Sequence, residues 1–211
     1  LKRLGRKDDL IEAQSRYIDI LNSVQKSNSI EMMYTTELEN QKKDIISYHS
    51  RDPLTKLFNR EYFEKKVTEY IEQKRSFAFV LIDLDHFKQI NDQHGHLVGD
   101  LALKHVANIF EKYDSVQFIS GRFGGDEFIC IYEVESVGQM KQDIQLLNDF
   151  LQIQFLVVDD QEINLSLSLG ATYYAGKNES YADLFAMADA ALYKSKKDGR
   201  GRANIFEKAY Q

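Results

Sequence analysis

The sequence has a single cysteine among its 211 residues, and it has no long apolar run. One cysteine, Cys130, excludes an internal disulfide framework and a cysteine-rich zinc site, and it is typical of a reducing compartment. We interpret Cys130 as a buried strand residue. A membrane-spanning helix needs roughly 18 consecutive apolar residues, whereas the run from Phe77 to Ile82 has only the length of a strand. We therefore expect a soluble chain without a membrane segment.

The sequence also lacks an excess of basic residues. Lys and Arg number 27 against 33 Asp and Glu, which gives a net charge of -6. A nucleic-acid binder usually carries a broad basic surface, so no nucleic-acid partner is expected, and an anionic substrate would need a local basic pocket or metal ions. The sequence starts at Leu1 and not at methionine, which indicates a fragment or a processed product. We expect it in the cytoplasm, either alone or as the cytoplasmic part of a longer, membrane-attached sensor protein.

Proline and glycine are both absent between Asp8 and Ser50. Charges of both signs alternate there with isolated apolar residues, which predicts one long helix. One heptad position is apolar except at Glu31, and its other members are Leu10, Tyr17, Val24, Leu38 and Ile45. A long helix with a narrow apolar stripe needs a partner. The pattern therefore favours a parallel, dimeric coiled coil, with a helix packed on its own domain as the alternative.

The single proline, Pro53, ends this helix, because proline pushes the residue before it out of helical geometry. We place the domain boundary there, with a signalling helix over residues 1–50 and one globular domain over 51–211. The expected helices run from Thr55 or Asn59 to Lys74 and over 100–112, 137–152 and 181–197, and the expected strands over 76–83, 117–120, 128–133, 154–158, 162–173 and 204–206. This irregular alternation predicts an α+β fold, with a central, mainly antiparallel sheet flanked by helices.

Two acidic pairs stand next to expected strand ends. The buried strand that ends at Asp83 is followed by Leu84 and Asp85, and strand alternation places the two aspartates on one face. The second pair, Asp126-Glu127, follows Gly124-Gly125, where a hairpin turn without side chains lets a ligand approach the backbone. If the hairpin lies beside the strand, carboxylates from both elements converge. Converging carboxylates suit a hard divalent cation such as Mg²⁺, which also bridges substrate phosphates.

Other familiar ligand-binding motifs are missing. The sequence has neither a Walker-type phosphate loop nor a dinucleotide-binding glycine motif. A calcium loop starting at Asp83 would need a glycine and a glutamate where Lys88 and His94 stand. The nearby histidines favour structural roles over zinc binding, since they lack paired spacing and a cysteine. The acidic pairs are therefore the main candidates for chemistry.

Several ordered motifs resemble those of the GGDEF domains of bacterial diguanylate cyclases. The first is Asp52 to Arg60, and the others are 83–92, 95–100, the signature Gly124 to Phe128 preceded by Arg122, 166–170, and 188–193 followed by Lys196, Gly199 and Arg200. The resemblance covers about Arg51 to Phe206. It implies a nucleotidyl-cyclase fold and the condensation of two GTP molecules into cyclic di-GMP, with release of two pyrophosphates.

The resemblance also implies a role for individual residues. Two Mg²⁺ ions per active site, replaceable by Mn²⁺, would be held by Asp83, the Leu84 backbone carbonyl, Asp126 and Glu127. The catalytic residues would be Asp126, Glu127, which helps to deprotonate the attacking hydroxyl, and Lys196. GTP would be bound through guanine by Asn91 and Asp100 and otherwise by His86, Phe87, Lys88, Gly124, Gly125, Lys196 and Arg200, the three cations contacting phosphate oxygens.

The implied reaction requires two domains to face each other, since each domain binds one GTP. The N-terminal helix offers a route to this homodimer, and we expect an upstream input to act through its register. One departure from the family concerns product inhibition. Many members carry an Arg-x-x-Asp clamp for cyclic di-GMP, but Ser115 and Phe118 stand at its charged positions. We therefore expect weak or absent feedback inhibition through this site.

Three other functions remain open from the sequence. A domain of this kind can bind GTP or cyclic di-GMP without catalysis, although the intact acidic residues argue against this. A cyclase of the same fold can make a mixed or adenine-containing dinucleotide, against which Asp100 argues. A coiled-coil interaction protein with a merely structural domain would leave the paired carboxylates unexplained.

Overall fold

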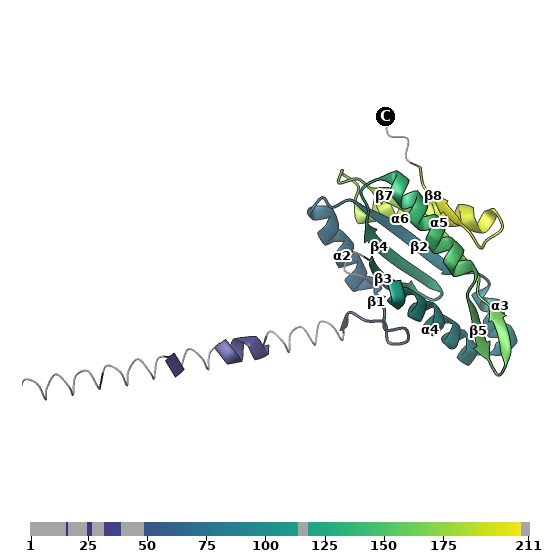
Figure 1. Cartoon of the computed structure of the whole chain (residues 1–211), viewed down its shortest axis with the longest axis horizontal. Coiled ribbons are helices and arrows are strands. Elements are labelled where there is room, and N and C mark those ends of the chain that lie inside the picture. The colour runs from purple at the N-terminus through teal and green to yellow at the C-terminus, as the bar shows by residue number, and fades with distance from the viewer. Residues whose placement is uncertain (1–15, 17–24, 27–31, 39–48, 114–117, 208–211) are drawn as a thin grey trace, which may run out of the picture. The chain divides into compact units, whose positions relative to one another are not determined.

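The computed structural model describes residues 16, 25–26, 32–38, 49–113 and 118–207 (Figure 1). The chain divides into two compact units, Leu1–His49 and Ser50–Gln211. In the first unit, residues 32–38 are helical and Leu38, one of the expected heptad residues, is exposed. The other heptad positions, Leu10, Tyr17, Val24, Glu31 and Ile45, lie outside the described residues. None of the helices in the described part of the chain is both long and apolar enough to cross a membrane.

The second unit is built on a six-stranded sheet with the order β1-β3-β4-β2-β7-β8. Its strands are β1 (Phe58–Asn59), β2 (Phe77–Leu84), β3 (Phe118–Gly124), β4 (Glu127–Glu133), β7 (Leu167–Tyr174) and β8 (Ala203–Ile205). The three central pairings are antiparallel, and only the short outer strands β1 and β8 pair in parallel. The prediction of a mainly antiparallel sheet is therefore confirmed.

Helices cover both faces of this sheet (Figure 1). On one face, α4 (His96–Tyr113) and α5 (Val137–Gln152) form an apolar core with Val80 and Ile82 of β2. On the other face, α2 (Arg60–Glu72) and α6 (Tyr181–Lys197) form a second core with Phe79 and Leu81. Successive side chains of a strand point to opposite faces. Since a core covers each face of the sheet, all eight residues of β2 are buried. This explains why its sequence is a continuous apolar run. Cys130 is buried in β4, as predicted.

Polar side chains at the helix starts fix the helix bounds. Asn59 caps α2 by accepting a hydrogen bond from the Tyr62 amide at 3.0 Å, so of the two predicted caps it is Asn59 that begins the helix. Ser180 caps α6 and forms a reciprocal capping box with Asp183. The bounds of α5 and α6 are those predicted from the sequence.

Two predictions of secondary structure are wrong in detail. The sequence did not predict the short helix α3 (Phe87–His94), and α4 begins at His96, before the predicted Asp100. The two helices meet at Gly95, whose φ of +86° ends α3. The predicted strand over 162–173 is two strands, since β6 (Gln161–Asn164) pairs with β5 (Phe155–Val158) in a separate hairpin, whereas β7 pairs with β2.

Candidate active site

The two acidic pairs lie at the same end of the sheet. Asp83 near the end of β2 stands directly opposite Glu127 at the start of β4. The Leu84 amide donates a hydrogen bond to the Asp126 carbonyl at 3.1 Å, which joins the hairpin turn to the end of β2. Asp83 is buried, Asp126 is half-buried and Glu127 is exposed. The carboxylates of Asp83 and Glu127 therefore belong to adjacent strands with solvent on one side.

The protein environment makes it costly to ionise both of these groups. Burial raises the pKa of Asp83, and the negative charges of Asp126 and Asp85 raise it further, whereas the Lys196 ammonium opposes them. Partial burial also raises the pKa of Glu127, and the negative charge of Asp83 raises it further. Like charges in an incompletely solvated site favour a bound cation.

Lys196 provides such a cation within the chain itself. It lies in the last turn of α6, and its Nζ is 2.7 Å from Asp83 Oδ2. The helix reaches this place because Gly170 of β7 lets it approach closely: a Cβ on Gly170 would lie 2.2 Å from both the Ala188 carbonyl oxygen and the Leu192 amide nitrogen. The structure thus brings Lys196 into the acidic site.

Asp85 does not join these open carboxylates. Strand β2 ends at Leu84, and the side chain of Asp85 is fully buried. Its carboxylate accepts hydrogen bonds from Ser166 Oγ at 2.8 Å, from Ser168 Oγ at 2.8 Å and from the Gly201 amide at 3.0 Å. With these donors around it, Asp85 is a structural anchor, and Asp83 alone represents β2 in the open site.

The signature turn is held by a side chain of its own hairpin, which in turn contacts the segment before α2. Gly125 has a positive φ of +53°, as predicted for this turn, whereas Gly124 does not. Arg122 donates two hydrogen bonds to the Gly125 carbonyl, from Nε at 3.1 Å and from Nη2 at 2.7 Å. Its Nη1 is 3.1 Å from Asp52 Oδ1, so the segment before α2 supports the turn. A Cβ on Gly124 or on Gly125 would meet no atom within 4 Å, so the turn borders open space at both glycines.

The Asp52 carboxylate in this contact is kept ionised. Burial by itself would raise the pKa of Asp52, but hydrogen bonds from the Thr55 amide and hydroxyl and from Arg122 outweigh it and hold the pKa below its ordinary value. The ion pair between Asp52 and Arg122 therefore persists at neutral pH.

Asn91 and Asp100 lie on two consecutive helices, of which the sequence did not predict the first and predicted too late a start for the second. Asn91 lies on α3 and Asp100 on the first turns of α4. A Cβ on Gly99 would lie 1.9 Å from Asn91 Oδ1, so the amide rests directly on the backbone of α4 beside Asp100. Both side chains are half-buried, which suits recognition of a polar ligand edge.

The remaining predicted residues lie at the start of α3 and after the end of α6. His86 is the N-cap of α3 with a φ of +59°, and Phe87 and Lys88 form its first turn. Arg200 follows α6 with a φ of +64°, and its Nε is 3.8 Å from Asp85 Oδ1. Lys88 and Arg200 are exposed and have the reach of long, flexible cations.

The acidic residues fit a divalent cation that takes part of its ligands from elsewhere. Across the described ranges, no three acidic, histidine or cysteine side chains are arranged as a complete metal site. The Lys196 ammonium beside Asp83 nevertheless shows that a positive charge is accommodated where the carboxylates meet. Mg²⁺ characteristically uses one or two protein carboxylates together with water and phosphate oxygens, so this donor set is suitable.

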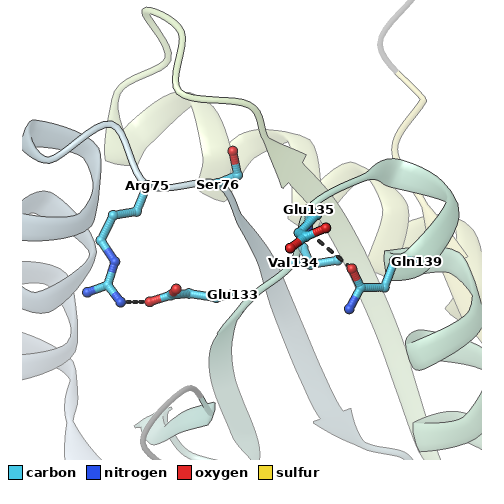
Figure 2. Close-up of a pocket in the computed structure, with 6 residues that line it drawn as sticks. All are labelled: Arg75, Ser76, Glu133, Val134, Glu135 and Gln139. Carbon is cyan, nitrogen blue, oxygen red and sulfur yellow. Dashed lines mark hydrogen bonds and ion pairs between the residues drawn. The ribbon is translucent and has the colours of Figure 1, made fainter.

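A separate cavity of about 680 Å³ lies at the opposite ends of β2 and β4. Figure 2 shows its polar lining, which includes Arg75, Glu133, Glu135 and Gln139. Arg75 forms an ion pair with Glu133, and the Glu135 amide donates to Gln139 Oε1 at 3.1 Å. The Arg75 guanidinium in this lining is thus already paired with a carboxylate.

Sequence reasoning missed the residues that support the site from a distance. Ser166 and Ser168 were recognised only as parts of a motif, and no local pattern connected them with Asp85, which lies 81 and 83 positions away. The pairing of Asp52 with Arg122 likewise spans 70 positions. The signal was present as polar residues at fixed places in the motifs, but only the fold shows which of them meet.

Comparison with known proteins agrees with this geometry. The family model "Diguanylate cyclase, GGDEF domain" matches residues 49–202. Diguanylate cyclase A of Treponema denticola is 29% identical over 168 residues, covering 76% of this chain and 45% of that protein. The chain spans less than half of the length of the first curated relatives that it matches.

Solved structures have the same fold. The diguanylate cyclase SiaD from Pseudomonas aeruginosa, solved in complex with its activator SiaC, superposes with a TM-score of 0.84 and 26% identity over 97% of this chain and 79% of that one. The GGDEF domain of DgcB from Caulobacter crescentus, in complex with c-di-GMP, superposes with a TM-score of 0.68 and 27% identity over 76% of this chain and 94% of that one. Because the family model covers more than half of its residues, the chain belongs to the GGDEF family of diguanylate cyclases.

Proposed function

We propose that this chain is a diguanylate cyclase, which condenses two GTP molecules into cyclic di-GMP and releases two pyrophosphates. The observation that carries the proposal is the meeting of Asp83, Glu127 and Lys196 at the end of β2. Negative and positive side chains at one solvent-accessible place can bind a metal–triphosphate complex, because the carboxylates suit the metal and the cation suits the phosphates.

The acidic residues would prepare the reacting groups. Asp83, the Leu84 carbonyl, Asp126 and Glu127 would hold two Mg²⁺ ions, or Mn²⁺ in their place, which lower the pKa of the 3′-hydroxyl and neutralise charge at the α-phosphate. Glu127 would help to take the proton from that hydroxyl.

Other side chains would bind and orient GTP. Asp100 would accept hydrogen bonds from the guanine N1 and amino groups, and Asn91 would pair with a neighbouring acceptor and donor, which selects GTP over ATP. Lys196, Arg200 and Lys88 would contact phosphate oxygens, assisted by backbone N–H groups at the start of α3 around His86 and Phe87. The open space at Gly124 and Gly125 would admit the substrate.

Turnover would require a homodimer, since the attacking hydroxyl belongs to the GTP held by a second domain. We propose residues 1–50 as the signalling helix that brings two cyclase domains, residues 51–211, together in the cytoplasm. Exposure of the apolar side chains Met32, Met33, Tyr34 and Leu38 supports a helix that pairs with its copy. An upstream input would then regulate activity by changing how often the half-sites meet.

Product inhibition through an Arg-x-x-Asp clamp would be weak or absent. Phe118 stands in β3 at the position of the clamp aspartate, and its ring lies 5.9 Å from that of Tyr132. Ser115, at the arginine position, lies outside the described residues. An apolar ring packed against a second ring cannot supply the charge that such a clamp requires.

A direct test is incubation of the purified chain with GTP and Mg²⁺, followed by chromatography of the products. We expect cyclic di-GMP and pyrophosphate from the wild type and no product from folded Asp126→Ala or Glu127→Ala variants. Glu162→Ala is the matched control and should stay active, because Glu162 is exposed on β6, in the separate two-stranded hairpin. GTP binding without turnover would indicate a signalling module instead, and equal use of ATP would indicate a cyclase for mixed dinucleotides.

A further inference from the structure

Asp85 is the most completely buried acidic group beside the proposed phosphate site, and that site makes no chemical use of it. Its side chain is 0% exposed. We propose that Asp85 is a positioning residue for substrate phosphates: it fixes the turn after α6, and thereby aligns Lys196 and Arg200 with the triphosphate. The proposal rests on the proposed function, because it assumes that these two cations bind GTP.

The first argument is the number of elements that Asp85 joins. Its carboxylate follows β2, accepts hydrogen bonds from Ser166 and Ser168 at the start of β7, and accepts a third from the Gly201 amide between α6 and β8. The Asp85 amide also donates to the Ser166 carbonyl at 2.8 Å. Burial of a carboxylate is unfavourable unless donors surround it, so this arrangement holds three separate segments in one geometry.

The second argument is the conformation of the turn that Asp85 holds. Gly199, Arg200 and Gly201 have positive φ values of 111°, 64° and 56°. A positive φ is unfavourable for a residue with a side chain, such as Arg200, and it persists only where surrounding contacts impose it. The Arg200 amide is held by the Ser195 carbonyl at 3.0 Å, and the Gly201 amide is held by Asp85. Asp85 thus fixes the residue next to Arg200.

The third argument is how the two neighbouring acids divide their contacts. Asp83 contacts a cation directly, with its Oδ2 2.7 Å from Lys196 Nζ. Asp85 contacts the Gly201 backbone in the turn after α6, and its Oδ1 is 3.8 Å from Arg200 Nε. The last turn of α6 is therefore held by Asp83, and the turn that follows it is held by Asp85.

This geometry has a specific consequence for nucleotide binding. If the turn loses its anchor, Arg200 and the end of α6 sample other positions, and contacts with the terminal phosphates weaken. Contacts with guanine through Asn91 and Asp100 come from α3 and α4 and remain intact. Loss of the anchor should therefore reduce the affinity for GTP without reducing the affinity for GMP.

The test compares GTP and GMP binding by isothermal titration calorimetry, using the full chain with Ca²⁺ in place of Mg²⁺ to slow turnover. For Asp85→Asn, which keeps the shape of the side chain but removes its charge, we expect GTP affinity to fall about tenfold, in the range for losing one charge-assisted contact. GMP affinity should change less than about twofold. Arg200→Gln should reproduce this selective loss, and Asp149→Asn, the same chemical change on an exposed carboxylate of α5, should leave both affinities unchanged.

The outcomes separate the proposal from its premise. Equal losses of GTP and GMP affinity, or no loss in a folded Asp85→Asn protein, would overturn the positioning role. If Asp85→Asn does not fold, Ser166→Ala removes one donor and keeps the carboxylate, and it should show a smaller loss confined to GTP. If the wild type prefers neither GTP over GMP nor GTP over ATP, the proposed function itself fails.

Discussion

Glu127→Gln should make the metal-free domain more stable while it removes activity. Glu127 stands directly opposite Asp83 in an antiparallel pair, where like charges are destabilising by roughly 0.2–1 kcal/mol. Because Glu127 is exposed, solvent screening places the expected gain in the lower half of that range, about 0.5 kcal/mol. For a domain of this size, this corresponds to an increase in Tm of about 1–2 °C.

The gain should depend on pH in a defined direction. Burial and the charge of Asp83 raise the pKa of Glu127 above its ordinary value of 4.5. A carboxyl group with a raised pKa in the folded state contributes stability below its unfolded pKa, and this contribution is lost as the pH rises through the folded pKa. Glutamine is neutral throughout. The stabilisation by Glu127→Gln should therefore be largest near neutral pH and disappear below the ordinary pKa, where the wild-type glutamate is already protonated.

The assay is thermal unfolding of the wild type and Glu127→Gln in EDTA, at several pH values from neutral to below the ordinary pKa of glutamate. Glu162→Gln on β6 is the control for an exposed glutamate on another strand. Added Mg²⁺ should stabilise the wild type more than the variant. A Glu127→Gln protein that is less stable at neutral pH, or one whose gain is the same at every pH, would refute the view that the two carboxylates repel each other in this site.

Three further predictions concern glycines and the N-terminal helix. Gly99→Ala places a Cβ 1.9 Å from Asn91 Oδ1 and should displace the amide. The preference for GTP over ATP in competitive binding should then fall about tenfold, as for one lost hydrogen bond to the base. An unchanged preference would argue against Asn91 as a guanine contact. Gly170→Ala creates backbone clashes at 2.2 Å and should cost about 3 kcal/mol or more in chemical denaturation, whereas the loss should be small if α6 can shift freely. Deletion of residues 1–50 should reduce specific activity most strongly at low protein concentration, and equal activity at all concentrations would contradict a dimer held by this helix.

The parts of the fold that were predictable from sequence are those with strong local signals. The run of Phe77 to Ile82 is continuous because both faces of β2 are buried, and the bounds of α6 follow from Ser180 at its start and the basic residues in its last turn. Helix α3 has no comparable signal, since Ile90 is its only buried residue. Because α3 carries polar side chains on most of its surface, apolar periodicity does not detect it.

The difference between Asp83 and Asp85 could not be predicted from the sequence for a related reason. Both are aspartates at the end of the same apolar strand, and alternation alone assigns them to one face. Their roles are separated by partners that are distant along the chain: Lys196 meets Asp83 in the open site, whereas Ser168 and the Gly201 amide enclose Asp85, the latter 116 positions away. The Asp83 side chain keeps 9% exposure and the Asp85 side chain none, so these distant partners separate two acids that are both largely buried.

Contacts between distant parts of the chain also determine the surroundings of Asp126 and Glu127. These residues lie beside the end of β2 only because β4 pairs with β2 in the register that sets Glu127 against Asp83. Moving that register by one residue would turn Glu127 away from Asp83 and would exchange the apolar residues of β4 between the two cores, since neighbouring side chains of a strand point to opposite faces. The fit of β2 and β4 into both cores, which stabilises the sheet, thus also keeps the carboxylates together. A variant that weakens this register should lose activity before it loses the fold.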